Sequence, residues 1–226
     1  ILNEEFFTID AVDFSQYILK SARAQEANGE KRNAAKTFAH AWRCGASGNN
    51  QEISNIARVE LFSIALLVND LIFASSIYRD LLSTFSLENR FHGACAHHDL
   101  GKIYRNAWEY NEIVNPNDAI KHLIAAKDEF TDLNQARNAA CVEMDLAHIY
   151  INIQKIEQAV ELLFSARKKW EDIDDIHGRA ESALSIGDCY TLLGENEDAE
   201  KYFSIASNEF ENAGITHENR KDNSLN

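Results

Sequence analysis

The residues best suited to chemistry are histidines and cysteines near the middle of the chain. Cys95 precedes the run His97-His98-Asp99, and Cys141 precedes His148. Thiolate and imidazole groups are ligands that zinc prefers, so one candidate is a zinc site formed by Cys95, His98, Cys141 and His148. These four side chains would have to converge from different turns of two helices that pack about 8–10 Å apart. We therefore favour packed or solvated histidines and predict no bound metal.

Other catalytic patterns are absent from the sequence. There is no glycine-rich phosphate loop, no His-Glu-x-x-His motif and no Gly-x-Ser-x-Gly nucleophile turn. Carboxylates are numerous, but the surfaces of acidic helices provide chance pairs of them. The sequence therefore predicts a protein that is not an enzyme and that uses no cofactor.

The charge of the chain narrows the class of partner. The formal net charge is −14, which disfavours nucleic acids and anionic membranes because both carry the same sign. The most apolar stretch, from Leu61 to Ala74, is interrupted by Asn69 and Asp70 and is too short to span a bilayer. We therefore expect a protein partner and no membrane partner.

The four cysteines are too widely separated for a Cys-x-x-Cys motif. They are Cys44, Cys95, Cys141 and Cys189. A free cysteine behaves as a small buried apolar residue, so we expect reduced core cysteines and a cytoplasmic protein.

The elements that carry these residues recur along the chain. The pattern Ala159, Leu163, Ala166, Trp170 has spacings of 4, 3 and 4, which place all four side chains on one face of a helix. Copies of the pattern begin at Ala34, Ala74, Ala119 and Ala199. We expect the last aromatic residues of the four stronger copies to be buried; they are Phe85, Phe130, Trp170 and Phe210.

A second pattern precedes each copy. Ile186-Gly187-x-x-Tyr190 lies before Ala199, and similar runs lie before Ala159 and Ala119. The pattern is degraded before Ala34 and Ala74. Small residues let two antiparallel helices approach closely, so each repeat is expected to be a first helix, a turn and a second helix. Gly29 and Gly194 fall at turns, and Asp118 is expected to be the N-cap of the second helix in the third repeat.

These residues resemble the tetratricopeptide repeat (TPR), in its longer subclass of about 40 residues per repeat. The fifth repeat, with Ile186-Gly187, Tyr190, Gly194, Ala199, Phe203 and Ala206, matches nearly every position. HEAT and armadillo repeats have a similar period but lack the Gly-x-x-Tyr and Ala-x3-Phe-x2-Ala patterns. The resemblance implies an all-α fold, a right-handed superhelical solenoid of about five antiparallel helix pairs. We expect a single repeat domain over residues 1–214, with repeats near 14–45, 53–86, 94–134, 140–174 and 180–213, and a polar mobile tail over 215–226.

The resemblance also implies a concave groove lined by the first helices of the repeats, which we call the A helices. The middle of this groove is locally basic in an acidic protein, and the second repeat beside it is apolar. The predicted partner-binding residues are His98, Lys102, Arg105, Asn106, His148, Asn152, Val59, Leu66 and Met144. An insertion of about six residues in the third repeat lengthens its A helix and adds Trp108 and Tyr110 as accessory contacts.

Three functions remain open at this point. The first is a scaffold or adaptor that binds a protein or an extended, acidic peptide in the groove. The second is the ligand-sensing repeat half of a peptide-responsive regulator. The third is a self-associating scaffold that forms a homodimer.

Overall fold

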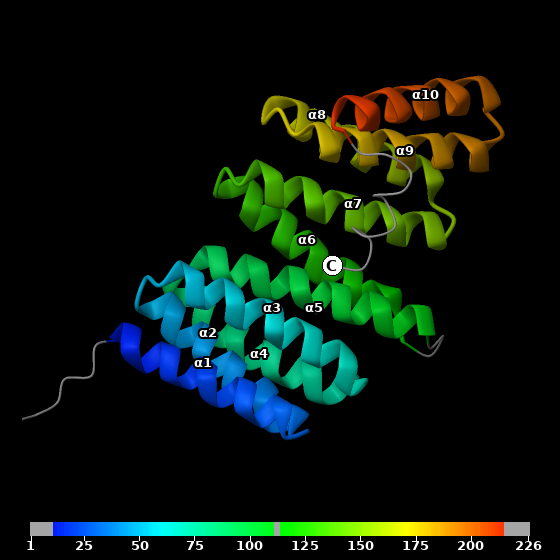
Figure 1. Cartoon of the computed structure of the whole chain (residues 1–226). Coiled ribbons are helices and arrows are strands. Elements are labelled where there is room, and N and C mark those ends of the chain that lie inside the picture. Colours follow the sequence, from blue (N-terminus) through cyan, green and yellow to red (C-terminus); the bar gives the residue numbers. More distant parts are fainter. Residues whose placement is uncertain (1–10, 111–113, 215–226) are drawn as a thin grey trace, which may run out of the picture. The chain divides into compact units, whose positions relative to one another are not determined.

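The computed structural model describes residues 11–110 and 114–214, and nearly all of them are helical (Figure 1). Within these ranges there are ten helices and no strand. The bounds are α1 (Ala11–Ala27), α2 (Lys31–Ser47), α3 (Gln51–Val68), α4 (Leu71–Glu88), α5 (Arg90–Tyr110), α6 (Pro116–Asp132), α7 (Ala136–Asn152), α8 (Ile156–Asp172), α9 (Ile176–Leu193) and α10 (Asn196–Asn212). The all-α fold is confirmed, whereas the handedness of the solenoid stays a prediction. The tail predicted over residues 215–226 lies outside the described residues.

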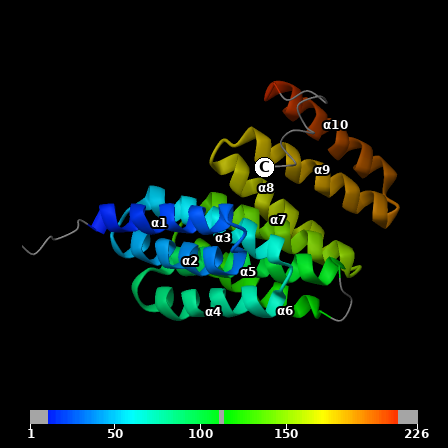
Figure 2. The ribbon, with the colours of Figure 1, turned by 60° about the horizontal axis from the view of Figure 1, so that its bottom comes forward.

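The chain divides into two compact units, Ile1–Val114 and Asn115–Asn226. In the N-terminal unit α1 contacts α3 and α3 contacts α5, whereas α2 contacts α4. The A helices thus form one layer and the second helices another, as the view in Figure 2 shows for α1, α3 and α4. In the C-terminal unit each helix from α6 to α9 packs against the next one along the chain.

The same tight turn joins many of the helices. One residue of the turn adopts a left-handed conformation, and the next residue donates its backbone N–H to a carbonyl five positions earlier. Gly29 and Gly194 occupy the left-handed position, with φ of 81° and 78°, as predicted from their spacing. Elsewhere the position is filled by residues with a Cβ, namely Asn49, Asn134, Gln154 and Asp174.

Close contact between small and aromatic residues sets the spacing of the helices. A Cβ added to Gly187 on α9 would lie 2.5 Å from Cε1 of Phe203 on α10. A Cβ on Gly178 would lie 2.6 Å from Cγ of Trp170 on α8. Two positions of the repeat pattern, Gly187 and Phe203, are therefore in direct contact, which explains why they recur together.

The predicted core aromatics are buried. Phe85, Phe130, Trp170 and Phe210 are each at most 4% exposed. In the C-terminal unit Trp170 packs with Ala140 and Ala166. The helical register deduced from the alanine pattern is therefore correct.

Two expectations about single residues were wrong. Asp118 is not the N-cap of α6, because the side chain of Asn115 accepts the cap hydrogen bond from the Asn117 N–H at 3.0 Å and Pro116 opens the helix. Asp118 lies in the first turn, where its charge is favourable. Among the cysteines, Cys95 and Cys189 are buried, but Cys141 is exposed because it shares the exposed side of α7 with His148 and Asn152.

A buried polar cluster lies inside the N-terminal unit. The Trp42 indole N–H donates to Nδ1 of His92 at 2.9 Å, and the His92 ring also lies 5.5 Å from that of Phe85. Burial, and then the charge of Arg58, lowers the pKa of His92 from 6.5 to about 4. The hydrogen bond from Trp42 requires an unprotonated Nδ1, so His92 is neutral in the folded protein.

The contact between Gly187 and Phe203 can be tested by a double-mutant cycle. Gly187→Ala overpacks the helix contact and should lower the free energy of unfolding by about 1–3 kcal/mol. In a Phe203→Leu background the added methyl group meets a smaller side chain, so the same exchange should cost less. Urea unfolding of the four proteins measures both steps. Equal costs in the two backgrounds would show that the two residues do not meet.

The buried state of His92 predicts a dependence of stability on pH. Its pKa is lower in the folded chain than in the unfolded chain, so the unfolded state takes up a proton as pH falls from 6.5 towards 4. Stability is therefore full above pH 6.5 and falls through this window, by on the order of 3 kcal/mol from this group. We expect the free energy of unfolding to fall less between pH 7 and pH 4.5 in His92→Gln than in the wild type, because the variant lacks this titrating group. Urea unfolding of both proteins at the two pH values measures the difference. An unchanged decline would mean that His92 titrates normally.

Candidate functional site

An A helix of the N-terminal unit exposes apolar side chains. Val59, Phe62 and Leu66 recur on one side of α3 at spacings of three and four residues. Val59 is 62% exposed, and Phe62 and Leu66 are half-buried. Leu67, beside them, is also 62% exposed. Such a run on a helix that buries its other side is typical of a contact surface.

The predicted basic residues lie on α5, next to this apolar run. His98, Lys102, Arg105 and Asn106 are half-buried and share one side of the helix. The ammonium group of Lys102 lies 4.9 Å from the centre of the Phe62 ring, a cation–π contact between α5 and α3. We call Val59, Phe62, Leu66, His98, Lys102, Arg105 and Asn106 the α3–α5 face.

Part of the positive charge on this face is already compensated. Arg105 Nε lies 3.7 Å from Glu109 Oε1, one helical turn further along α5. On the neighbouring A helix, Arg23 lies 3.2 Å from Glu60. Lys102 is therefore the cation that contributes most to the field of the face, because its contact is with an aromatic ring and leaves its charge uncompensated.

A buried ion pair holds α3 against α5 beneath the face. Arg58 donates from Nε and from Nη2 to the two carboxylate oxygens of Asp99, at 2.8 and 2.7 Å. This two-point geometry fixes the register of the two helices. The sequence placed Asp99 in the run His97-His98-Asp99 but did not pair it with Arg58. The only signal for the pair was the presence of charges among apolar neighbours on two A helices.

The other predicted site residues lie in the C-terminal unit, on α7. His148 and Asn152 are exposed, whereas Met144 is half-buried and packs against the cluster that contains Trp170. Asp188 on α9 lies close enough to His148 for the histidine's charge to act on it. Burial raises the pKa of Asp188, and the charge of His148 opposes that rise. We call Met144, His148 and Asn152 the α7 face; it belongs to a different unit from the α3–α5 face.

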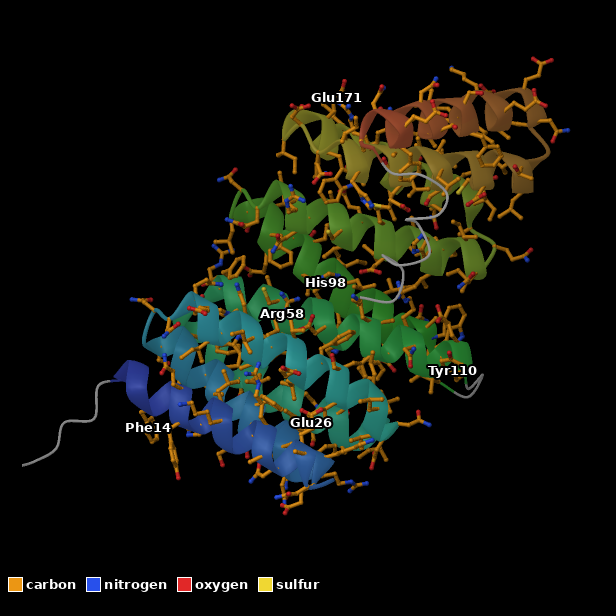
Figure 3. All side chains as sticks on the ribbon, viewed as in Figure 1. Phe14, Glu26, Arg58, His98, Tyr110 and Glu171 are labelled. Carbon is orange, nitrogen blue, oxygen red and sulfur yellow. The ribbon has the colours of Figure 1, made fainter. Side chains whose placement is uncertain are left out.

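The insertion in the third repeat lengthens α5, as predicted. The helix continues to Tyr110, which is 83% exposed and stands at its end in Figure 3. Trp108 is half-buried. The lengthened end of α5 forms one wall of a cavity of about 690 Å³ in the N-terminal unit, to which Leu66 and Asn106 of the α3–α5 face also contribute.

Neither a metal cluster nor a membrane-spanning helix is found in residues 11–110 and 114–214. No group of three or more histidine, cysteine or acidic side chains there has the geometry to hold a metal ion. No helix in the same ranges is both long enough and apolar enough to cross a bilayer. Burial raises the pKa of the Cys95 thiol to about 12, so this residue is a protonated core side chain.

A comparison with the profiles of known protein families shows which family the chain belongs to. The profile of the soluble NSF attachment protein (SNAP) family matches residues 85–225, which is more than half of the sequence. The chain belongs to the SNAP family. The SNAP fold is a TPR-like helical repeat, so the TPR resemblance found in the sequence is confirmed.

Solved structures support the same fold for this SNAP-family chain. The crystal structure of BtubC (BKLC) from P. vanneervenii matches with a TM-score of 0.67 at 15% identity, over 92% of this chain and 83% of that one. A putative kinesin light chain from Podosopora anserina with TPR-like repeats matches with a TM-score of 0.61 at 13% identity, over 89% and 96%. The apo form of RapI matches with a TM-score of 0.62 at 16% identity, over 90% and 66%. These likenesses concern the fold. A search of curated protein sequences found no match.

The pairing of His148 with Asp188 can be tested by titration. The positive charge of His148 opposes the burial that raises the pKa of Asp188, so His148→Ala should raise that pKa further. NMR titration of the Asp188 carboxyl carbon in both proteins measures the change. A pKa that stays the same or falls in the variant would show that the two side chains do not interact.

Proposed function

We propose that this SNAP-family protein is a cytoplasmic adaptor without catalytic activity. It binds a protein or an extended peptide segment through the A helices. The contacts are His98, Lys102, Arg105, Asn106, Val59 and Leu66 on the α3–α5 face, and His148, Asn152 and Met144 on the α7 face. Trp108 and Tyr110 are accessory contacts.

The observation that carries this proposal is the exposure of apolar residues on α3 beside a cation on α5. Covering a side chain such as Val59 or Leu67 stabilises a complex by about 1.5–3 kcal/mol when it becomes fully buried. On the α3–α5 face the apolar side chains of α3 can pack against a partner, and the polar side chains of α5 can form hydrogen bonds with it. Asn106 and Lys102 can hold a peptide backbone or a carboxylate beside this apolar surface.

Charge favours an acidic partner at the α3–α5 face. The protein carries a net charge of −14, so an acidic segment is repelled by most of the chain and attracted to Lys102. The C-terminal unit differs, because Asp188 stands beside His148 there. We therefore expect the acidic part of a partner to bind α5 and not α9.

The family name provides a first partner to test. The SNAP family is described as attaching to NSF. NSF is therefore the first protein to offer to this chain, followed by proteins recovered by pull-down from the source cells and identified by mass spectrometry.

Charge reversal on the face tests the proposal. Lys102→Glu combined with Arg105→Glu should weaken binding of the recovered partner about tenfold or more, ~1.4 kcal/mol, because the acidic segment then meets like charge. Raised salt should weaken the wild-type complex in the same direction. Affinities are measured by isothermal titration calorimetry.

The matched control carries the same change of charge on second helices. Lys121→Glu with Lys168→Glu alters two exposed lysines on α6 and α8. This control should bind like the wild type. If the control lost binding while the face variant kept it, the assignment of the face would be wrong.

A further inference from the structure

Two contacts between α3 and α5 lie about one helical turn apart. The deeper contact is the ion pair of Arg58 with Asp99, whose side chains are 25% and 7% exposed. The other is the cation–π contact of Lys102 with Phe62 at the surface. Phe62 is four residues beyond Arg58 on α3, and Lys102 is three residues beyond Asp99 on α5. These spacings keep the two contacts on the same sides of the two helices, one above the other.

The ion pair is the stronger constraint of the two. Helix α3 packs extensively against α2, and α5 against α4, whereas α3 and α5 meet each other narrowly. Little apolar packing therefore fixes how far α5 is shifted along α3. The Arg58 guanidinium donates two parallel hydrogen bonds to one carboxylate, which fixes direction as well as distance. The contact of Lys102 is weaker, because it joins one flexible side chain to a ring, and it depends on where the two helices are held.

Stability alone does not account for this pair. Desolvation of two charges offsets much of their attraction, and apolar residues of similar size are often at least as stabilising. The Tyr78 hydroxyl is fully buried and has no hydrogen-bond partner among the residues that the structure describes. Burial and then the charge of Asp99 raise the pKa of Tyr78, and the charge of Arg58 opposes that rise, so the hydroxyl lies within the field of the pair. A cluster that leaves a buried hydroxyl unpaired is not the most stable filling of this space.

The position of Lys102 is sensitive to the register of the two helices. Its ammonium group lies 4.9 Å from the centre of the Phe62 ring, and cation–π attraction extends to about 6 Å. A helix rises by about 1.5 Å per residue, so a slip of one residue along α5 would carry the ammonium group to that limit. Such a slip would separate the cation from the apolar side chains of α3.

We propose that Arg58 and Asp99 are positioning residues for the α3–α5 face. Their two-point contact sets the register that holds Lys102 over Phe62, so that the face presents its cation and its apolar side chains at a fixed separation. A partner that uses both then binds without first ordering the lysine. The effect of the pair on a partner rests on the proposed adaptor function, whereas its effect on Lys102 does not.

NMR spectroscopy of the full chain, labelled with ¹³C in its lysines, tests the effect on Lys102 directly. The face of an aromatic ring shifts nearby protons upfield, so the ε-methylene protons of Lys102 should be shifted upfield in the wild type. Lys102→Arg identifies the signal by its loss, and Phe62→Leu should remove the upfield shift. Urea unfolding measures the stability of every variant, and isothermal titration calorimetry measures its affinity for the partner recovered by pull-down.

Arg58→Lys is the decisive variant, because it keeps the charge and loses the two-point geometry. It should reduce the upfield shift of Lys102 by more than half and weaken the partner about threefold or more. Arg58→Met with Asp99→Val replaces the pair by apolar side chains, so it should have the same two effects while its urea midpoint equals or exceeds that of the wild type.

The matched control makes the same exchange in a similar pair of the C-terminal unit. Arg167 on α8 donates two hydrogen bonds to the carboxylate of Glu209 on α10, at 2.9 and 2.8 Å. Arg167→Lys loses that two-point geometry as well. It should leave the Lys102 signal and the affinity for the partner unchanged.

An upfield shift that keeps half or more of its size in the two pair variants overturns the positioning role, and so does its absence from the wild type. If Arg58→Lys does not fold, the apolar double variant decides alone. Lys102→Glu with Arg105→Glu separates this proposal from the adaptor proposal. If that protein loses the partner while both pair variants bind it as the wild type does, the face stands and the pair has no role in binding. If it binds the partner normally, the adaptor proposal fails, and the Lys102 signal still decides whether the pair sets the register.

Discussion

The structure depends on close contact between small residues and aromatic rings on neighbouring helices. Gly187 has room for hydrogen and nothing larger, because a Cβ there would lie 2.5 Å from the Phe203 ring. Gly178 stands in the same relation to Trp170. A helix pair held this closely cannot bury its remaining apolar residues within itself, so these must be covered by the next helix along the chain. The buried aromatics Phe85, Phe130 and Phe210 follow from the same requirement.

This constraint leaves one side of each A helix available to a partner. Helix α3 contacts α1, α2 and α5, and the Arg58–Asp99 pair ties it to α5. The side of α3 that carries Val59 is nevertheless exposed. A chain selected for stability alone would place polar residues there. Val59 and Leu67 are exposed instead, and Val59 shares the α3–α5 face with a lysine that lies over an aromatic ring, which supports the proposed binding role of this face.

The repeat pattern made the fold predictable, and it did so through local chemistry. Alanines at helical spacing predicted the second helices, and glycines predicted two of the left-handed turns. The N-cap of α6 was misplaced because Asn115, Asn117 and Asp118 all have capping side chains and only the backbone geometry selects Asn115. The Arg58–Asp99 pair could not be found from the sequence, since 41 positions separate the partners and no local rule pairs them. Of the predicted site residues, the structure brings Leu66, Lys102 and Asn106 close together through Phe62 and the cavity, and places Met144, His148 and Asn152 on a separate unit.

The central claim is that the partner covers the A-helix face of α3 and α5. Hydrogen–deuterium exchange of the full chain, with and without saturating partner, tests it most directly, because backbone amides covered by an interface exchange more slowly. We expect new protection in peptides that span residues 59–68 and 98–110, with little change in α2 and α4. Protection confined to the bodies of α2 and α4, with α3 and α5 unchanged, would contradict it.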